Sequence, residues 1–448
     1  MRHTFLSFVP SVLVFCSQIL ISFNKDLSST QSAQSRDLNH HFLPRNLQSF
    51  PDVLVNTISD DEQTNPSVAS LKGGGFVVVW ESKNAESGSS DFDVRGQLFS
   101  VSGTKVLGEF SIPETFNLKQ RAPKAAALED GGFVVVWTSD AGGYTEGYFR
   151  IFEANGDPRT GETKVCSTDL SEKSGVVVSG LKKGGFVIVW KGTDVYGNIF
   201  DSNGNELLGE KFTVNLSTQN NPWSIFTPAV VGLSDGGFLS SWILKPGTKD
   251  LMAQRFTRFG IRIGPEMFNP KIMMVEQVIP QVASTTDKYL LKWEKESPPK
   301  VYLNLFYNNG TQIAFISDIP DYSFQQEGAA ITFLKNGDFV VVFSSLQNTD
   351  YNIVGRGFDN NGNEKEGYFT INQNTSGTQA CPSIAPLGEG FVVVWQSNHG
   401  GNNDIYMRIY NSLTSEKCTD HMDCASDFPK CETDSGICVE CLGPPDCQ

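Results

Sequence analysis

The 448-residue sequence predicts an all-β fold, a seven-bladed β-propeller with four-stranded blades, and three observations support this prediction. A hydrophobic pattern, GGFVVVW in its first two copies, recurs seven times. The copies end at Trp80, Trp137, Trp190, Trp242, Trp293, Phe343 and Trp395, with spacings of 50 to 57 residues. Each copy contains four short strand-like segments in a constant order. Self-similarity at such a period is typical of propellers.

The first two segments of a copy have distinct compositions. The first is of the type seen at residues 66–71, which begins with proline and has a small residue, Ala69, at its fourth position. Small residues suit strands that crowd around an axis. The second is the Phe-Val-Val-Val-Trp run of residues 76–80, whose unbroken β-branched residues predict a strand that is covered on both faces.

The third segment, as at residues 93–99, ends at an aromatic residue. In three copies an Asn-Gly pair follows it, at residues 203–204, 309–310 and 361–362. Asn-Gly favours a type I′ hairpin, because both central residues of that turn need a positive φ. The fourth segment is of the type seen at residues 212–215 and 369–372.

The two ends of the repeat array are complementary. The last copy stops after its third segment at Tyr410, and an unmatched fourth segment, residues 53–56, precedes the first copy. We therefore expect residues 53–56 to pair beside residues 405–410. That N-terminal strand would complete the seventh blade and close the ring without a free sheet edge.

These motifs resemble a group of secreted repeats. The GGFVVVW segment followed by Gly96-Gln97-Leu98-Phe99 resembles repeats in large surface proteins of bacteria and in secreted proteins of ciliate-like protists. The segment at residues 355–359, Gly-Arg-Gly-Phe-Asp, fits the same pattern, and the resemblance covers residues 51–411. It implies a propeller and secretion, and it names no activity. The motifs differ from those of Kelch repeats, WD40 repeats and sialidases.

The remaining segments predict a secreted chain. Residues 1–22 form a signal peptide, since residues 5–21 are largely apolar after Arg2 and His3; an uncleaved anchor is the alternative, although the run is short and interrupted. Residues 23–50 form a disordered linker, residues 51–412 the propeller and residues 413–448 a cysteine-rich module. The net charge of −15 argues against a nucleic-acid partner. We expect no stable membrane insertion.

The cysteines cluster in the C-terminal segment. Six of the nine are Cys418, Cys424, Cys431, Cys438, Cys441 and Cys447. In a secreted chain this density predicts disulfides, with 15 pairings open. Cys438 and Cys441 are the single pair at zinc-ligand spacing, so metal binding is the weaker interpretation. The segment resembles cysteine-rich modules of growth-factor-receptor and EGF-type ectodomains. Cys166 and Cys381 lie in non-adjacent blades and are expected to be buried thiols.

Catalytic groups are scarce in the predicted ring. His399 is its one histidine, which argues against a Ser-His-Asp triad or a multi-histidine metal site; we expect it to be an exposed loop residue. We predict no catalytic residue, no metal and no cofactor. The segments at residues 201–205 and 359–363 are rich in oxygen ligands, but we expect them to be hairpin turns rather than calcium loops.

One polar position recurs at the start of the third segment. Its occupants are Asp93, Glu146, Asp194, Asp250, Lys300, Asn352 and Asp404. A side chain that recurs in most blades favours a structural role as a hydrogen-bond acceptor. A pair of catalytic carboxylates in a carbohydrate-active enzyme is the alternative.

Loop lengths indicate which face of the ring binds a ligand. The interval between the second and third segments varies from 10 to 19 residues, whereas the hairpin before GGF hardly changes. The variable loops and the connections between blades leave on one face. The longest such connection contains Trp223, which we expect to be a recognition residue; a plug over the channel mouth is the alternative.

The predicted function is therefore a secreted, non-enzymatic binding or adhesion module that recognises a glycan or an extracellular protein. Trp223 and the aspartates Asp93, Asp194, Asp250 and Asp404 are the predicted ligand contacts. The alternatives are a carbohydrate-active enzyme that uses carboxylates near the central channel, and a structural component of granules or a cell coat. Three Asn-x-Ser/Thr sequons, at Asn215, Asn309 and Asn374, predict N-glycosylation.

Overall fold

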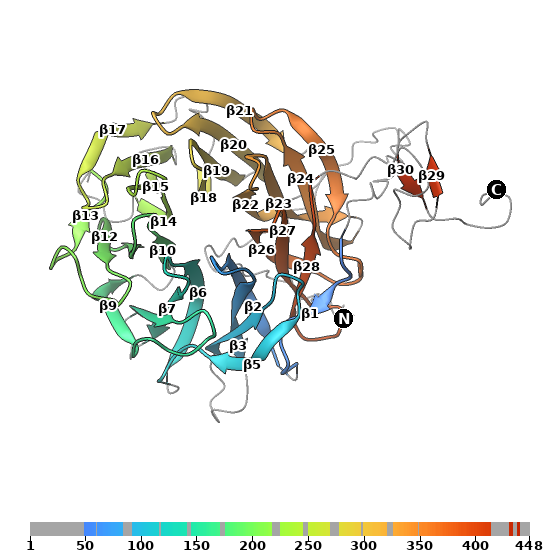
Figure 1. Ribbon diagram of the computed structural model, residues 1–448, viewed down its shortest axis with the longest axis horizontal. Coiled ribbons are helices and arrows are strands. Elements are labelled where there is room, and N and C mark those ends of the chain that lie inside the picture. Colours follow the sequence, from blue (N-terminus) through green and yellow to red (C-terminus); the bar gives the residue numbers. More distant parts are fainter. Residues whose placement is uncertain are drawn as a thin grey trace, which may run out of the picture.

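The computed structural model is a ring of β-sheets around a central axis (Figure 1). Every element in the described part of the chain is a strand, and this part contains no helix able to cross a bilayer. The described residues are 49–59, 61–83, 92–115, 118–140, 145–170, 175–216, 225–244, 250–268, 277–296, 299–319, 326–347, 349–413, 430–432 and 437–439.

Seven sheets of four antiparallel strands form the ring, which confirms the predicted seven-bladed propeller. Within a blade the strands follow one another from the axis to the rim (Figure 1). Blades one to six are β2–β5, β6–β9, β10–β13, β14–β17, β18–β21 and β22–β25, and blade seven is β26–β28 with β1.

The innermost strands line the axis. They are β2 (Gln63–Ser70), β6 (Lys119–Ala127), β10 (Val176–Gly180), β14 (Ile225–Gly232), β18 (Gln277–Ser284), β22 (Gln326–Phe333) and β26 (Gln379–Leu387). The second strands contain the repeated Phe-Val-Val-Val-Trp segment, and most of their side chains are buried. They are β3 (Phe76–Lys83), β7 (Phe133–Asp140), β11 (Phe186–Lys191), β15 (Phe238–Leu244), β19 (Lys288–Glu296), β23 (Phe339–Gln347) and β27 (Gly390–Ser397).

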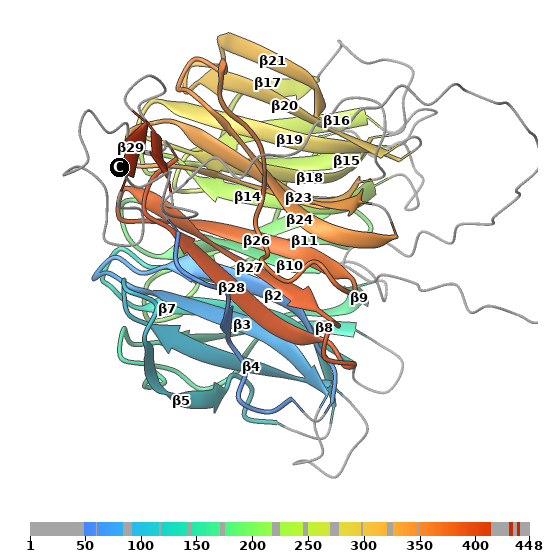
Figure 2. The same ribbon diagram turned by 90° about the vertical axis from the view of Figure 1, so that its right-hand side faces the viewer.

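The third and outermost strands complete each blade, and Figure 2 shows them crossing the side of the ring. The third strands are β4 (Phe92–Phe99), β8 (Thr145–Phe152), β12 (Val195–Phe200), β16 (Asp250–Phe256), β20 (Pro299–Tyr307), β24 (Asp350–Phe358) and β28 (Asp404–Tyr410). The outermost strands are β5 (Lys105–Ser111), β9 (Thr163–Leu170), β13 (Phe212–Thr213), β17 (Arg262–Phe268), β21 (Gln312–Ile319), β25 (Glu364–Thr370) and β1 (Val53–Leu54).

Blade seven combines strands from the two ends of the ring segment. β1 pairs antiparallel with β28, with Val53 opposite Met407 and Leu54 opposite Tyr406. Figure 1 shows β1 beside β28 at the rim. The Val55 N–H continues the pairing by donating to the Ile405 carbonyl at 2.8 Å. Residues more than 350 positions apart in the chain are therefore neighbours in one sheet.

Stacked aromatic rings explain the aromatic end of every third strand. Phe76 and Phe99 are cross-strand partners, and their ring centroids lie 5.0 Å apart with nearly parallel planes. The same pair recurs in every blade, as far as Phe391 and Tyr410 at 4.7 Å in blade seven. Such cross-strand pairs add to sheet stability beyond the area that they bury.

The second glycine of the GGF turn packs against the same aromatic pair. Gly75 has a φ of +74°, and a Cβ at this position would lie 2.2 Å from the carbonyl oxygen of Phe99. A side chain here would clash with backbone. The repeated glycine is therefore required by a close approach as well as by the turn.

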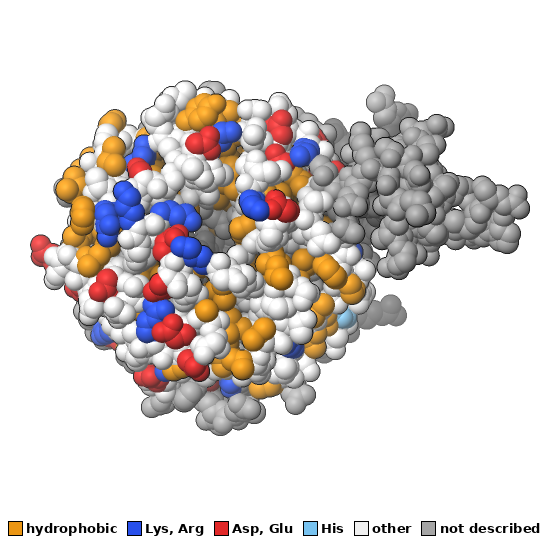
Figure 3. All heavy atoms as spheres, in the orientation of Figure 1, with side chains coloured by type: hydrophobic (Ala, Val, Ile, Leu, Met, Phe, Trp, Pro, Cys, Tyr) orange, Lys and Arg blue, Asp and Glu red, His pale blue; other side chains and the backbone are white. Residues whose placement is uncertain are grey.

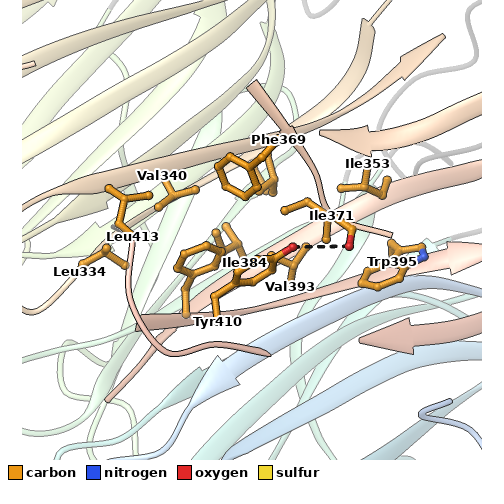
Figure 4. Packing of buried hydrophobic residues seen from close by; sticks show 13 residues of the cluster. Leu334, Val340, Ile353, Phe369, Ile371, Ile384, Val393, Trp395, Tyr410 and Leu413 are labelled. Atoms are coloured by element: carbon orange, nitrogen blue, oxygen red, sulfur yellow. Dashed lines mark hydrogen bonds between the residues drawn. The ribbon is translucent and has the colours of Figure 1, made fainter. Parts of the chain in front are cut away.

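The hydrophobic core consists of seven clusters, each between two adjacent blades. Figure 4 shows the cluster of blades six and seven, where Phe369 and Ile371 meet Ile384, Val393 and Tyr410. The Tyr410 hydroxyl donates to the Ile371 carbonyl at 3.4 Å. Covered on both faces in this way, the second strands are buried along nearly their whole length, as their composition predicts.

A similar cluster joins blades seven and one. It combines Val68 and Phe76 of blade one with Val392 and Met407 of blade seven, and Val55 beyond β1 lies in it fully buried. The ring is thus continuous in its packing as well as in its strand order.

The Asn-Gly hairpins differ from the prediction. In the segment at residues 201–205, the Gly204 N–H donates to the Asp201 carbonyl at 3.1 Å, and Gly204 has a φ of +86° while Asn203 has no positive φ. This is a type I turn followed by a glycine bulge, so the predicted type I′ turn is wrong. The Asp201 side chain stabilises this turn by accepting the Asn203 and Asn205 N–H groups at 2.8 and 2.9 Å.

The cysteine predictions have mixed outcomes. Cys381 is buried and disulfide-bonded, so the predicted free thiol is wrong at this position. Cys166 lies in β9 opposite Gly147. In the C-terminal segment, Cys431 on β29 (Lys430–Glu432) is the cross-strand partner of Cys438 on β30 (Ile437–Val439). The other predicted disulfide cysteines, Trp223, the signal peptide and most of the linker lie outside the described residues.

Candidate functional site on the ring axis

The recurring acidic position holds the outermost strand in place. In blade three, Asn215 donates through Nδ2 to Asp194 Oδ1 at 2.9 Å and accepts the Val195 N–H through Oδ1 at 2.8 Å. In blade seven, Asn56 makes the same two contacts, to Asp404 at 2.7 Å and from Ile405 at 2.7 Å. These carboxylates therefore act as hydrogen-bond acceptors inside their blades.

The four predicted aspartates do not gather in one place. Asp93 and Asp250 are 3% and 9% exposed, and Asp194 and Asp404 are half-buried. They stand on or beside the third strands of blades one, four, three and seven. Burial raises the pKa of the Asp404 carboxyl above its ordinary value, and the hydrogen bond from Asn56 opposes this effect.

His399 is packed rather than exposed in a loop. The His399 imidazole is half-buried, and its centroid lies 4.9 Å from that of the Tyr406 ring. It shares hydrogen bonds with the hydroxyls of Ser397 at 2.7 Å and Tyr406 at 3.3 Å. The predicted exposure is therefore wrong. The signal missed in the sequence is the short loop of residues 398–403, which folds the imidazole back onto the blade.

The innermost strands share a strained bulge. Asn65, Ala122, Ile279 and Cys381 each precede a proline and have φ values between 49° and 54°. The register between the first and second strands shifts at each of these places. A bulge leaves one residue out of the ladder, so its N–H needs another acceptor.

Side chains of the preceding blade accept the N–H of the bulge residue at two of these bulges. The Ala122 N–H donates to Glu81 Oε1 at 2.7 Å, and the Asn65 N–H donates to Gln396 Oε1 at 3.0 Å. Glu81 and Gln396 each follow the repeated tryptophan. Glu81 is 1% exposed, and burial raises its pKa, which the Ala122 hydrogen bond and Arg121 oppose.

The bulges surround an axial cavity of about 260 Å³. All seven innermost strands contribute to its wall. Its lining combines prolines and aliphatic residues with hydroxyl, amide and ammonium groups. The polar side chains among the described lining residues are Asn65, Ser67, Lys124, Gln281, Lys292 and Ser383.

The lining contains two lysines and, among the described residues, no carboxylate. Lys292 is fully buried and donates to Glu294 Oε1 at 2.5 Å and to the Ile279 carbonyl at 3.1 Å. Burial lowers the pKa of Lys292, and Glu294 opposes this effect. Lys292 thus forms a buried ion pair with Glu294 and a hydrogen bond to the bulge of blade five.

A second hollow, of about 600 Å³, lies where the hairpins between first and second strands meet. Lys182 and Lys335 are among its lining residues. Both form ion pairs, Lys182 with Glu129 at 3.3 Å and Lys335 with Glu389. In Figure 3, basic and acidic side chains likewise lie next to one another around the central hollow. Exposed pairs of this kind contribute little to stability.

Fold and cavity together define the chain as a seven-bladed β-propeller protein. No protein-family model matches the chain, and no curated protein matches it in sequence. Among solved structures, a protein of unknown function from Dyadobacter fermentans is similar, with 12% identity, a TM-score of 0.51 and coverage of 81% of this chain and 98% of that chain.

Two further structures are similar at lower scores. AofleA from Arthrobotrys oligospora has 12% identity and a TM-score of 0.46 over 73% of this chain and 90% of its own. An α-L-arabinofuranosidase from Fusarium graminearum has 12% identity and a TM-score of 0.44 over 81% and 97%. Similarity at this level says nothing about function.

Proposed function

We propose that the protein is a secreted, non-enzymatic binding module that recognises a glycan in the axial cavity. The observation that carries this proposal is the mixed lining, in which Ser67, Gln281 and Ser383 stand among prolines and aliphatic side chains. A sugar ring presents hydroxyl groups and an apolar face, which suits such a wall. The volume is slightly below the roughly 300 Å³ typical of small ligand pockets, so one sugar residue is the unit that it accommodates.

The predicted aspartate contacts fit this proposal less well than the cavity does. Asp194 and Asp404 already accept hydrogen bonds from Asn215 and Asn56, so a ligand would compete with the outermost strands for them. Trp223 remains a predicted contact on the variable-loop face. A glycan that extends from the cavity toward that face could engage both.

The catalytic alternative needs two carboxylates on opposite sides of a scissile bond. The described lining offers lysines, hydroxyls and two amides instead, which favours binding. Hydrolysis of a bound glycan would replace the proposal by the enzyme alternative.

Secretion and modification complete the proposal. Asn309 and Asn374 are exposed and are the sequons that we propose to carry glycans. Asn215 is 2% exposed and both of its amide atoms are hydrogen-bonded, so a glycan there would disrupt blade three. We also propose that the six cysteines of residues 413–448 form disulfides.

A glycan array tests the function. The intact secreted protein is applied beside Gln281→Ala and Trp223→Ala, and the melting temperature of each variant is measured as a folding control. Binding that is lost in Gln281→Ala and kept in Trp223→Ala supports the cavity. Loss in Trp223→Ala alone moves the site to the loop face. Absence of any binding favours the structural granule or coat alternative.

A further inference from the structure

One position on the innermost strands supplies a side-chain hydrogen bond to the next blade in three of the seven blades. It is the residue after the bulge proline, occupied by Ser67, Gln281 and Ser383 in blades one, five and seven. Ser67 Oγ accepts the Ala125 N–H at 3.3 Å, Gln281 Oε1 accepts the Ile331 N–H at 3.0 Å, and Ser383 Oγ accepts the Val68 N–H at 3.2 Å. In these three blades the side chain is thus an acceptor that stabilises the adjoining blade.

Blade two places Lys124 at the same position, and a lysine cannot perform this role. An ammonium group has three donors and no acceptor. It cannot take the equivalent N–H of blade three, that of Val178. Among the described residues, no hydrogen bond uses the Lys124 ammonium. Within the described part of the chain, the Lys124 ammonium group therefore makes no hydrogen bond that joins blade two to blade three.

The neighbouring charges leave the Lys124 donors available. Glu81 is the acidic group that attracts Lys124, yet its oxygens already accept from the Ala122 N–H at 2.7 Å and from Arg121 Nη1 at 3.2 Å. Burial lowers the pKa of Lys124, and Glu81 opposes this effect. The second lining lysine, Lys292, is taken up by Glu294. A cavity wall with an ammonium group and no described carboxylate favours an anionic guest.

We propose that the axial cavity selects an acidic sugar residue, whose carboxylate or sulfate pairs with the ammonium group of Lys124. This inference rests on the proposed glycan-binding function and adds the substrate class. The neutral groups Ser67, Gln281 and Ser383 border the same cavity and suit the remaining hydroxyls. A charge-assisted hydrogen bond in a partly desolvated site is worth roughly 1.5–3 kcal/mol, which is about 10- to 150-fold in affinity.

Calorimetric titration of the intact protein tests the proposal with matched ligands. Methyl glucoside and methyl glucuronide differ at C6 alone, and methyl glucoside 6-sulfate separates sulfate from carboxylate. The wild-type protein is expected to bind one or both acidic sugars at least 10-fold more tightly than methyl glucoside. Sodium acetate and sodium sulfate alone are expected to bind far more weakly than the acidic sugars.

Three variants assign the effect to Lys124. Lys124→Gln installs the residue of blade five, so the acid preference should vanish while the melting temperature stays equal or rises. Lys124→Arg should keep the preference. Lys119→Gln, which removes the same charge from the start of the same strand outside the cavity, should change neither property.

The outcomes separate this inference from the function on which it rests. Equal binding of the neutral and acidic glycosides by the wild type overturns the acid preference and keeps glycan binding. An acid preference that survives in Lys124→Gln overturns the role of Lys124. If acetate or sulfate binds as tightly as the acidic sugars, the cavity binds anions in general, and the proposed selection of a sugar is overturned. Failure of every glycan, in this titration and on the array, overturns both proposals.

Discussion

Blades six and seven use the same hydrogen bonds to hold their outermost strands, yet they join very different parts of the chain. In blade six, Asn372 accepts the Ile353 N–H at 2.7 Å and donates to Asn352 at 2.7 Å, across 19 and 20 positions. In blade seven, Asn56 makes the matching contacts across 349 and 348 positions. The local geometry is equal, whereas the length of chain that each contact closes is not.

The comparison shows that the same hydrogen bonds close a short hairpin in blade six and the whole ring in blade seven. β25 is seven residues long and is tied to blade six by a hairpin, whereas β1 has two residues and no hairpin to β28. Loop closure costs more entropy as the loop grows, although the increase is slow. We therefore expect blade seven to open before blade six does.

The largest effect is expected from Val55→Asp. Val55 is fully buried between blades seven and one, so a carboxylate there should cost several kcal/mol and release β1. The exposed edge of β28 should then promote self-association. Size-exclusion chromatography with denaturant unfolding measures both effects.

Val55→Ala is the matched control, with an expected loss of about 2 kcal/mol and no self-association. A Val55→Asp protein that stays monomeric and unfolds at the wild-type midpoint would contradict the importance of this seam.

A smaller effect separates Asn56→Ala from Asn372→Ala. Each substitution removes three side-chain hydrogen bonds and should cost about 1–3 kcal/mol, because buried polar partners lose their acceptor or donor. Hydrogen exchange should reveal the contrast: the Ile405 amide should exchange faster in Asn56→Ala than the Ile353 amide does in Asn372→Ala. Equal acceleration of the two amides would remove the distinction between the blades.

The smallest effect is expected from Asp404→Asn, which gives blade seven the residue of blade six. Burial raises the folded-state pKa of Asp404 above its unfolded value, so this group favours folding at low pH. Its contribution is lost as pH rises through the folded-state pKa. Asp404→Asn should therefore be slightly more stable than the wild type at pH 7 and show a weaker pH dependence.

Unfolding curves at pH 4 and pH 7 test this prediction. The matched substitution Asn352→Asp should introduce the pH dependence into blade six. The expected pH dependence would be contradicted if Asp404→Asn raised the free energy of unfolding more at pH 4 than at pH 7.

Much of the fold follows from local patterns. The Phe-Val-Val-Val-Trp segments became second strands, the third-segment aromatics became their stacked partners, and the period near 50 residues became seven blades. Turn chemistry was less predictable. The Asn-Gly pairs were assigned a type I′ turn because the role of the preceding Asp201 as an acceptor depends on the folded hairpin.

The candidate site was less accessible to sequence reasoning. The aspartates recur at one position of the repeat, and in blades three and seven this position accepts a structural hydrogen bond from an asparagine. The sequence pattern does not indicate a role for Lys124, because its place in the cavity wall beside Ser67, Gln281 and Ser383 is seen only in the folded ring. The prediction for His399 is wrong because the short loop of residues 398–403 folds the imidazole onto Ser397 and Tyr406. The prediction for Cys381 is wrong because a disulfide pairing depends on the folded chain.

The amino-acid sequence by itself determined the strand order, the number of blades and the stacked aromatic pairs, because hydrophobic periodicity and turn residues act over a few positions. Tertiary structure decided which polar groups meet on the axis and at the seam. Asn56 meets Asp404 and Glu81 meets Ala122 when the ring closes and brings distant backbone groups within hydrogen-bond distance. Such contacts depend on the three-dimensional arrangement of whole blades, which no local pattern encodes.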